Sequence, residues 1–491
     1  MGTTQTVREY LQSRHYHVAP DQTYNHIDEW LEWYQNEVEK FHHYSIYNGV
    51  TTIKQDRYRL GMAKKVCEDW ANLLLNERVS IRAEHYTERL EQILHENNFY
   101  VQGNKLVELV FALGTGALVE YLGADNEVII DYLRADMIYP LSWDNGDVTE
   151  CAFGTPRSVR GKDAIYLQIH RHGDLDKEEN PDVYYLENTY IDADSGKEID
   201  PPEDVIPVVN TGSTEPLFQI LTPNICNNID LDSPLGISVY ANAISQIKSC
   251  DLIYDSYVNE YVLGRKRIMV PLSQAKRMMQ EDGVQTPVFD PHDTVYYMLP
   301  GDRGDENHLT EIDMTIRASD HELGIQRALD LMSLKCGMGS GRYKFESSGV
   351  KTATEVISDK SDLYQSRQRH CIIVSAAIIG MVRAVSFLDT GHAVDATVDF
   401  DDSIIEDSNA TIDKNIKLVQ AGLRSKLIAI MEINKYSEAD AKEELARIAE
   451  DGQITGQDID WTGDGTDQNG RHEEETEDPE ENRNDEGDQE E

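Results

Sequence analysis

The chain has 491 residues, of which 90 are acidic and 45 are basic, and its formal net charge is −45. This charge argues against a protein that grips a phosphate backbone over a broad basic face. No apolar run approaches the ~18 residues of a membrane span, and six scattered cysteines without CxxC spacing predict reduced thiols rather than disulfides or a zinc site. With 40% apolar residues, the chain can bury a sizeable core.

The first half of the chain predicts helices followed by antiparallel hairpins. Between residues 58 and 77, five apolar side chains recur at helical spacing: Met62, Val66, Trp70, Leu73 and Leu74. A second helix is expected at 105–113. From 117 to 221 the sequence is rich in β-branched and aromatic residues, which predicts strands. Turn residues interrupt these strands near 144–146, 172–174 and 194–196.

Two long helices joined by a short mixed segment are expected next. Asp232, Ser233 and Pro234 predict a helix start and Gly264 predicts its end, which gives a rod of roughly 40 Å. A helix is also expected near 273–281, between the rods. The second rod carries an apolar stripe at helical spacing: Ile325, Ala328, Leu329, Met332 and Cys336. Rods this long suit an assembly in which neighbouring copies bury the apolar stripes.

Another long helix is predicted over 352–387, roughly 55 Å in length, and Thr352 and Glu355 have the spacing of a capping box at its start. A strand near 393–403 and three amphipathic helices follow, at about 410–420, 427–433 and 438–449.

The segment 451–491 contains 17 acidic residues and two arginines, with Trp461 as its one aromatic residue. Its local charge of −15 leaves −30 for the rest of the chain. This composition predicts disorder, and the segment would serve either as a solubilising tail or as an electrostatic contact or spacer.

Motifs that would indicate an enzyme are weak. Asp399, Asp401 and Asp402 lie close together and could hold a cation, although a solvated strand end is the better explanation for them. The histidine pairs His42–His43 and His170–His172 lack ligand partners at metal-site spacing. We therefore expect no catalytic residues, no metal site and no cofactor.

A glycine-rich segment, GMGSGRYKFESSGVK at 337–351, joins two predicted helices and carries the cations Arg342, Lys344 and Lys351. Glycine, a few cations and aromatic residues suit sequence-blind contact with a phosphate backbone; the alternative is an ordinary surface loop. A second cationic group, Arg265, Lys266 and Arg267, follows a predicted helix end, where cations are favourable in any protein.

The order of these elements resembles the portal proteins of tailed bacteriophages, in particular the family typical of long-tailed phages of Gram-positive hosts. Four stretches carry the likeness: YRLGMAKKVCEDWANLLLNE (58–77), VFALGTGALVEYL (110–122), LDSPLGISVYANAISQIKSCDLIYDSYVNEYVLGRKRIMV (231–270) and GVKTATEVISDKSDLYQSRQ (349–368). The likeness runs from about residue 10 to residue 450.

The resemblance implies an α+β, mainly α, portal fold with a disordered acidic tail. Its parts would be a wing (1–232), a stem helix (233–264), a clip (265–316), a second stem helix (317–338), a tunnel loop (339–351), a long spine helix with a returning wing strand (352–403), a helical crown (404–450) and the tail (451–491). The tunnel-loop residues would be Gly339, Gly341, Arg342, Tyr343, Lys344, Phe345, Gly349 and Lys351. The stem residues of interest would be Asp251, Asp255, Arg265, Lys266 and Arg267.

The same resemblance implies a non-enzymatic ring of about twelve copies at one capsid vertex, assembled from host cytoplasm into the virion. Double-stranded DNA would pass through it during packaging and ejection. Its partners would be the terminase large subunit, a head–tail adaptor, and the major capsid and scaffolding proteins, with no membrane. The alternatives are another structural head or connector scaffold, or a metal-dependent nuclease using Asp399, Asp401 and Asp402.

Overall fold

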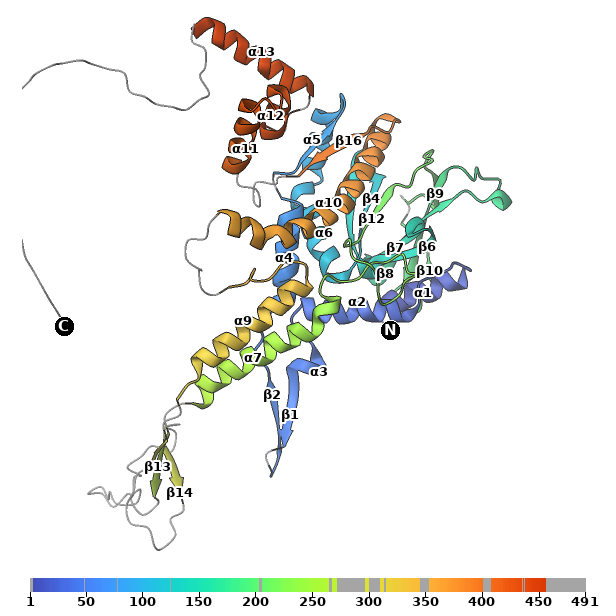
Figure 1. Cartoon of the computed structure of the whole chain (residues 1–491). Helices are drawn as coiled ribbons and strands as arrows, with labels where there is room; N and C mark the ends of the chain where they lie inside the picture. Colours follow the sequence, from blue (N-terminus) through green and yellow to red (C-terminus); the bar gives the residue numbers. More distant parts are fainter. Residues whose placement is uncertain are drawn as a thin grey trace, which may run out of the picture. The chain divides into compact units, whose positions relative to one another are not determined.

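The computed structural model describes residues 3–47, 49–76, 78–123, 125–202, 205–264, 267–271, 296–299, 310–312, 315–344, 353–400, 408–434, 436 and 438–455 (Figure 1). The chain divides into two compact units, Met1–Ile405 and Glu406–Glu491. Each unit is described by itself.

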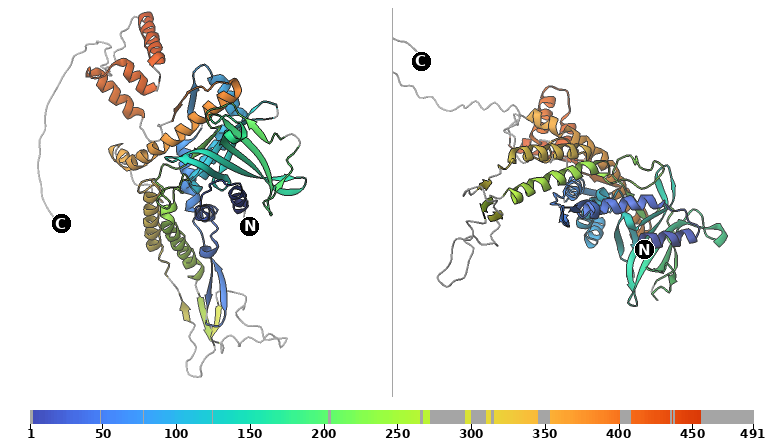
Figure 2. Two further views of the ribbon diagram at one scale, coloured as in Figure 1. Left: turned by 90° about the vertical axis from the view of Figure 1, so that its right-hand side faces the viewer. Right: turned by 90° about the horizontal axis from the view of Figure 1, so that it is seen from below.

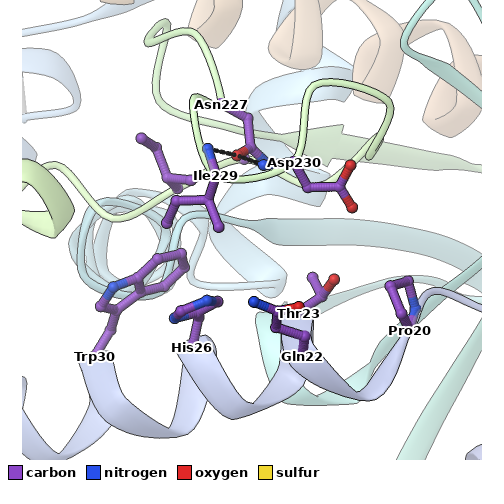
Figure 3. A pocket seen from close by; sticks show the side chains of 10 residues that line it. Pro20, Gln22, Thr23, His26, Trp30, Asn227, Ile229 and Asp230 are labelled. Carbon is purple, nitrogen blue, oxygen red and sulfur yellow. Dashed lines mark hydrogen bonds between the residues drawn. The ribbon is translucent and has the colours of Figure 1, made fainter.

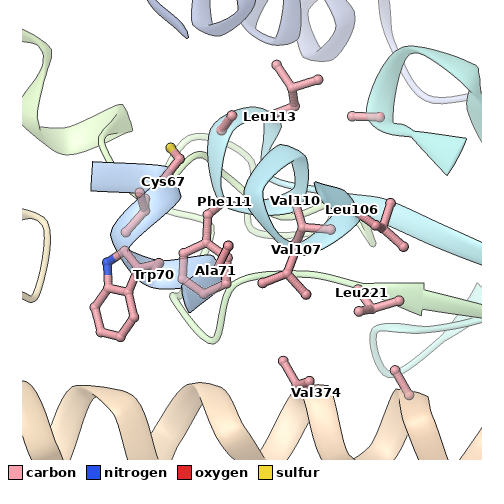
Figure 4. Close-up of a cluster of buried hydrophobic side chains, with 14 of the residues drawn as sticks. Cys67, Trp70, Ala71, Leu106, Val107, Val110, Phe111, Leu113, Leu221 and Val374 are labelled. Carbon is pink, nitrogen blue, oxygen red and sulfur yellow. The ribbon is translucent and has the colours of Figure 1, made fainter. Parts of the chain in front are cut away.

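Helices of the amino-terminal part build the centre of the first unit's core. They are α1 (Thr3–Ser13), α2 (Asp21–Tyr34), α3 (Glu39–His42), α4 (Met62–Leu74), α5 (Thr87–Glu96) and α6 (Phe99–Leu113). The five apolar residues predicted to share one face of α4 are all buried. Trp70 of α4 stacks on Phe111 of α6 with ring centroids 5.5 Å apart, within the cluster drawn in Figure 4. The helix predicted at 105–113 is the second half of α6.

Antiparallel strands occupy the region where hairpins were predicted. One sheet has the order β10–β9–β8–β7–β6, with β11 also paired to β9, and a second sheet has the order β12–β4–β5. The strand bounds are β4 (Gly116–Leu122), β5 (Val128–Arg134), β6 (Ile138–Asp144), β7 (Asp147–Val159), β8 (Lys162–His172), β9 (Tyr184–Asp192), β10 (Glu198–Ile199), β11 (Val208–Asn210) and β12 (Phe218–Leu221). The predicted turn at Asn145–Gly146 joins β6 to β7, where both residues have positive φ angles.

The first rod is shorter than predicted, because α7 spans Ile244–Leu263 and is about 30 Å long. The predicted start at Asp232–Pro234 was wrong. The backbone of Gly236 lies so close to Gly114 that a Cβ atom on Gly236 would stand 2.4 Å from the Gly114 carbonyl oxygen. Val239 N donates to Phe111 O at 2.9 Å. Residues near 236–239 are therefore buried against the α6–β4 turn rather than coiled into the helix.

The second rod, α9 (Ala318–Lys335), packs along α7, and its predicted apolar stripe is buried. Beyond the far ends of these helices lies a small sheet of order β14–β13–β15, formed by β13 (Arg267–Pro271), β14 (Tyr296–Leu299) and β15 (Thr310–Ile312). The helix predicted near 273–281 lies outside the described residues.

Helix α10 (Ala353–Thr390) is the longest element and packs on β12, β4 and α4. At Gly380, a Cβ atom would stand 2.1 Å from Gln219 Oε1 of β12, so glycine permits the close approach. By length and composition alone, Ser361–Thr390 could cross a membrane, a property that the sequence analysis did not find. Half of its most apolar window is buried inside the fold, as in the core helix of a globular protein.

The returning strand β16 (Ala396–Asp399) pairs antiparallel with β3 (Ser80–Ala83). The second unit holds α11 (Ser408–Gln420), α12 (Lys426–Asn434) and α13 (Glu438–Thr455), close to the three predicted helices. Because α13 continues to Thr455, residues 451–455 are helical and the prediction of disorder from residue 451 was wrong there. Residues 456–491, including Trp461, lie outside the described part of the chain, as does Thr352 of the predicted capping box.

Glu120 of β4 is fully buried, and neither of its carboxylate oxygens has a hydrogen-bond partner among the described residues. Burial raises the pKa of Glu120 to about 8. The carboxyl group is therefore protonated in the folded chain at pH values where it is ionised in the unfolded chain. Below the pKa of Glu120 in the unfolded chain, the group is protonated in both states and does not lower the free energy of unfolding. As the pH rises from that value to the pKa in the folded chain, the free energy of unfolding falls.

We predict that Glu120→Gln, which stays neutral, raises the melting temperature at pH 8 and has little effect at pH 5. Relative to the wild-type chain, the free energy of unfolding of the variant is expected to increase by about 1.4 kcal/mol per pH unit between the unfolded and folded pKa values of Glu120. Thermal unfolding at the two pH values measures it, and Glu84→Gln at an exposed carboxylate is the control. An equal effect of Glu120→Gln at both pH values would contradict the assignment.

Candidate functional site

The first residues of the glycine-rich loop are anchored to the core of the first unit. Gly339 and Gly341 both have positive φ angles, +75° and +76°. Ser333 Oγ donates to Gly339 O at 2.6 Å, and Gln326 Nε2 donates to Tyr343 O at 2.9 Å. The Tyr343 side chain packs against the hydrophobic core. The loop therefore leaves α9 along a path set by α9 itself.

Arg342 lies beside an acidic residue of α4 rather than standing alone. Its Nε atom is 3.9 Å from Asp69 Oδ2, and Lys65 Nζ is 2.8 Å from Asp69 Oδ1. Burial raises the pKa of Tyr343, and the neighbouring Asp69 carboxylate adds to this rise. Part of the Arg342 charge is offset by Asp69, which weakens its attraction for a distant anion.

Lys344 is the last described residue of the loop and is exposed. Phe345, Gly349 and Lys351, which the sequence analysis also placed in the tunnel loop, lie outside the described residues. The structure thus describes Gly339, Gly341, Arg342, Tyr343 and Lys344 of the predicted loop, and their role in a DNA channel stays a prediction.

The two acidic residues predicted in the stem, Asp251 and Asp255, are buried. Asp251 Oδ1 accepts from Leu60 N at 2.8 Å, and Asp255 Oδ1 accepts from Tyr58 N at 3.0 Å. Both side chains therefore fasten the segment before α4 to the middle of α7. No signal in the sequence pattern shows this role, because the partners are backbone groups about 190 residues away.

His42 completes this joint. Its Nδ1 accepts from Val38 N at 2.9 Å, so Nε2 carries the proton and donates to Asp251 Oδ2 at 3.2 Å. Burial lowers the pKa of His42 despite the neighbouring carboxylate. His42 is thus a buried residue that packs in the core and bonds to Asp251.

The cationic group after α7 is only partly described. Arg267 begins β13 and is paired in register with Ile312 of β15. Arg265 and Lys266 lie outside the described residues.

The outer face of α9 carries a second apolar stripe that the sequence analysis missed. Leu323, Leu331 and Leu334 are 60%, 57% and 53% exposed. Their spacing places them within an arc of about 80° on the side opposite the buried stripe. The exposed cation Arg327 lies within the same arc. Helix α9 therefore has one buried apolar stripe and a second, exposed row of three leucines that Arg327 interrupts.

The described residues offer little evidence for a metal site or for a ligand-binding pocket. Within the described residues, no group of three or more His, Cys, Asp or Glu side chains could hold a metal ion. Asp399 is exposed on β16, and Asp401 and Asp402 lie outside the described residues. His170 is buried beside Phe153 and Phe218, and burial lowers its pKa to about 3.

A small pocket of about 110 Å³ lies between α2 and the segment before α7 (Figure 3). His26 and Trp30 line one side of it. The Asn227 side chain accepts from Ile229 N and Asp230 N at 3.1 and 2.9 Å, so its oxygen already serves the local loop. We assign no ligand to this pocket.

Comparison with known families shows where this arrangement belongs. Residues 15–458 match the family model described as phage portal protein, SPP1 Gp6-like. The chain belongs to this portal protein family. The match begins after α1 and runs through α13, and so includes the helix pair α7–α9, the glycine-rich loop and α10.

No curated protein matches this portal chain. Similar solved chains occur in three structures of gene transfer agent (GTA) particles: the neck of an empty particle computed with C6 symmetry (12% identity, TM-score 0.43), the virion of a native particle (9%, 0.37), and the neck of a native particle computed with C12 symmetry (12%, 0.35). Each alignment covers 76% of this chain and 89% of the other. Because the TM-scores are below 0.5, we draw nothing further from these likenesses.

We predict that Tyr343→Ala releases the root of the glycine-rich loop. Trypsin cleavage after Arg342 and Lys344 should become several-fold faster, with a loss of about 2–4 kcal/mol in stability from the missing ring. Tyr343→Phe keeps the ring and is expected to be cut at the wild-type rate. Mass spectrometry of timed digests gives both rates, and wild-type cleavage of Tyr343→Ala would show that the ring does not anchor the loop.

Proposed function

We propose that this portal protein forms a closed ring at one capsid vertex and acts as the conduit for double-stranded DNA during packaging and ejection. The observation that carries the proposal is the family match over residues 15–458. In this assignment α7 and α9 are the stem, the β13–β15 sheet belongs to the clip, residues 339–351 are the tunnel loop, and the second unit is the crown. The first 232 residues with β16 form the wing.

The two-faced helix α9 supports a ring of identical copies. Its inner stripe packs within the chain, whereas Leu323, Leu331 and Leu334 leave an apolar surface on every copy. When one surface of a copy binds a different surface of the next copy, the same contact can repeat from copy to copy. The copies close into a ring if the rotation between neighbours is a whole fraction of 360°. We propose about twelve copies.

The charge distribution suits a channel that lets DNA slide. A chain with net charge −45 repels the phosphate backbone at close range, which prevents sticking. Asp69 offsets part of the charge of Arg342, and in this proposal the exposed Lys344 and the predicted loop cation Lys351 make the main contacts with the duplex. A few such contacts per copy guide DNA without the affinity of a broad basic surface.

Chemical work is assigned to other proteins in this proposal. The terminase large subunit would dock on the clip during packaging and supply ATP hydrolysis, and the head–tail adaptor would take its place afterwards. Capsid and scaffolding proteins would contact the wing. This portal chain contributes the passage and the docking surfaces.

Particle mass tests the proposed assembly. We expect purified chain to form a closed particle of about twelve copies, measured by mass photometry. A stable monomer or trimer at micromolar concentration would contradict the ring and favour another structural component of the head or connector.

The tunnel-loop cations are tested by a packaging assay. Lys344→Ala combined with Lys351→Ala should leave ring formation intact and reduce the DNA retained in filled particles several-fold, because sparse phosphate contacts are lost. Lys105→Ala combined with Lys162→Ala removes two exposed cations elsewhere on the first unit and is the matched control. Equal DNA retention in both double variants would remove the loop from the mechanism.

A further inference from the structure

A two-stranded hairpin beside the α7–α9 pair has an apolar face that the chain itself does not bury. Among the strands that the structure describes, β1 (His43–Tyr47) and β2 (Thr52–Asp56) pair with each other and with no third strand (Figure 1). Ile46 and Ile53 are 44% and 42% exposed, and every residue of β2 is exposed. An isolated two-stranded hairpin is marginally stable in water, so this hairpin is expected to gain order from a further surface.

The strand register gives the hairpin two different faces. Ile46 lies directly opposite Ile53, and Tyr44 lies opposite Gln55 on the same side. The other side carries Ser45 opposite Lys54. Because side chains alternate along a strand, one face of the hairpin is apolar and the other is mainly polar.

The root of the hairpin is held firmly against the stem. His42 precedes β1 and bonds to Asp251, while Tyr58, two residues after β2, donates to Asp255. His43 Nδ1 and Asp56 Oδ1, across the first pair of the hairpin, are 2.6 Å apart. The direction of the hairpin is therefore set by α7, and the left view of Figure 2 shows it extending toward the same end of the first unit as the helix pair.

The row of exposed leucines on α9 is about as long as the hairpin, and both present exposed aliphatic side chains, with Arg327 lying among the leucines. A five-residue strand spans roughly 17 Å, and the helix axis from Leu323 to Leu334 also covers roughly 17 Å. Both surfaces belong to one chain, yet Ile46, Ile53 and the three leucines remain exposed in it. Two different unfilled surfaces on the same chain are what a repeated head-to-tail contact requires.

We propose that the hairpin 43–56 is an intersubunit arm whose apolar face, centred on Ile46 and Ile53, packs on the outer α9 face of a second copy of this chain. This inference rests on the proposed ring and specifies one of its joints. Asp251, Asp255 and His42 then act as positioning residues that aim the arm.

Cross-linking of assembled full-length chain tests the contact. In a Cys226→Ser background, which removes the one exposed cysteine of the described residues, Ile53→Cys is combined in turn with Leu323→Cys, Leu331→Cys and Leu334→Cys. A short bifunctional maleimide should convert at least one double variant into a ladder of covalent multimers on a denaturing gel. The single variants, and Ile53→Cys with Leu175→Cys on an exposed site elsewhere, should give no ladder.

A second measurement uses no cross-linker. Ile46→Ser with Ile53→Ser should leave the melting temperature of the monomer unchanged and raise the concentration needed for assembly roughly tenfold or more. Thr52→Ser with Lys54→Ser changes the opposite face and is the control.

The outcomes separate this inference from the proposed function. Rings that form without any ladder, together with normal assembly of the isoleucine variant, would overturn the arm and leave the ring standing; the apolar face would then serve another protein. Efficient cross-linking within single chains would also overturn it. Failure of the wild-type chain to form rings would overturn both proposals.

Discussion

The surplus apolar surface of helix α9 is the constraint on which the rest of the account depends. An α-helix that packs against one neighbour needs one apolar stripe, and α9 has two. The stripe through Met332 and Cys336 is buried within the chain, whereas the stripe through Leu323, Leu331 and Leu334 is exposed. Burying an apolar side chain of this size contributes about 1.5–3 kcal/mol. Covering the exposed leucines with another surface would therefore favour association of the copies.

The charge of the chain and the position of its cations fit the same conclusion. A net charge of −45 excludes tight gripping of phosphates, yet a passage for DNA must not grip. The glycine-rich loop supplies the cations, and two of them, Arg342 and Lys344, lie within the described residues. Arg342 and Lys344 are both exposed, and Arg342 lies beside Asp69. An acidic body with few available cations is a sensible composition for a surface along which DNA moves.

Much of the fold could be predicted from periodicity. The face of α4, the antiparallel strands after α6 and the ends of α9 and α10 follow from local patterns that tertiary packing did not override. The start of α7 could not be predicted, because Ile237 is buried against Gly114 of the α6–β4 turn and Tyr240 is buried beside α2, where its hydroxyl donates to Trp30 O. The three-residue spacing of Ile237 and Tyr240 imitates a helical stripe. Local sequence does not distinguish these two kinds of burial.

The candidate site was predictable only in outline. Glycines and cations marked the loop at 339–351, but the anchoring of Tyr343 depends on Gln326 and the core, which the pattern does not reveal. The roles of Asp251 and Asp255 depend on backbone amides at Tyr58 and Leu60, far away in the chain. The second stripe of α9 was visible in the sequence and would have been found by testing the helix for two apolar faces.

A cryo-electron microscopy map of the purified full-length chain tests the central claim most directly. The account predicts a closed ring around an axial passage wide enough for a DNA duplex, with the outer leucines of α9 buried between adjacent copies. A particle without an axial passage, or a ring in which Leu323, Leu331 and Leu334 remain exposed to solvent, would contradict it.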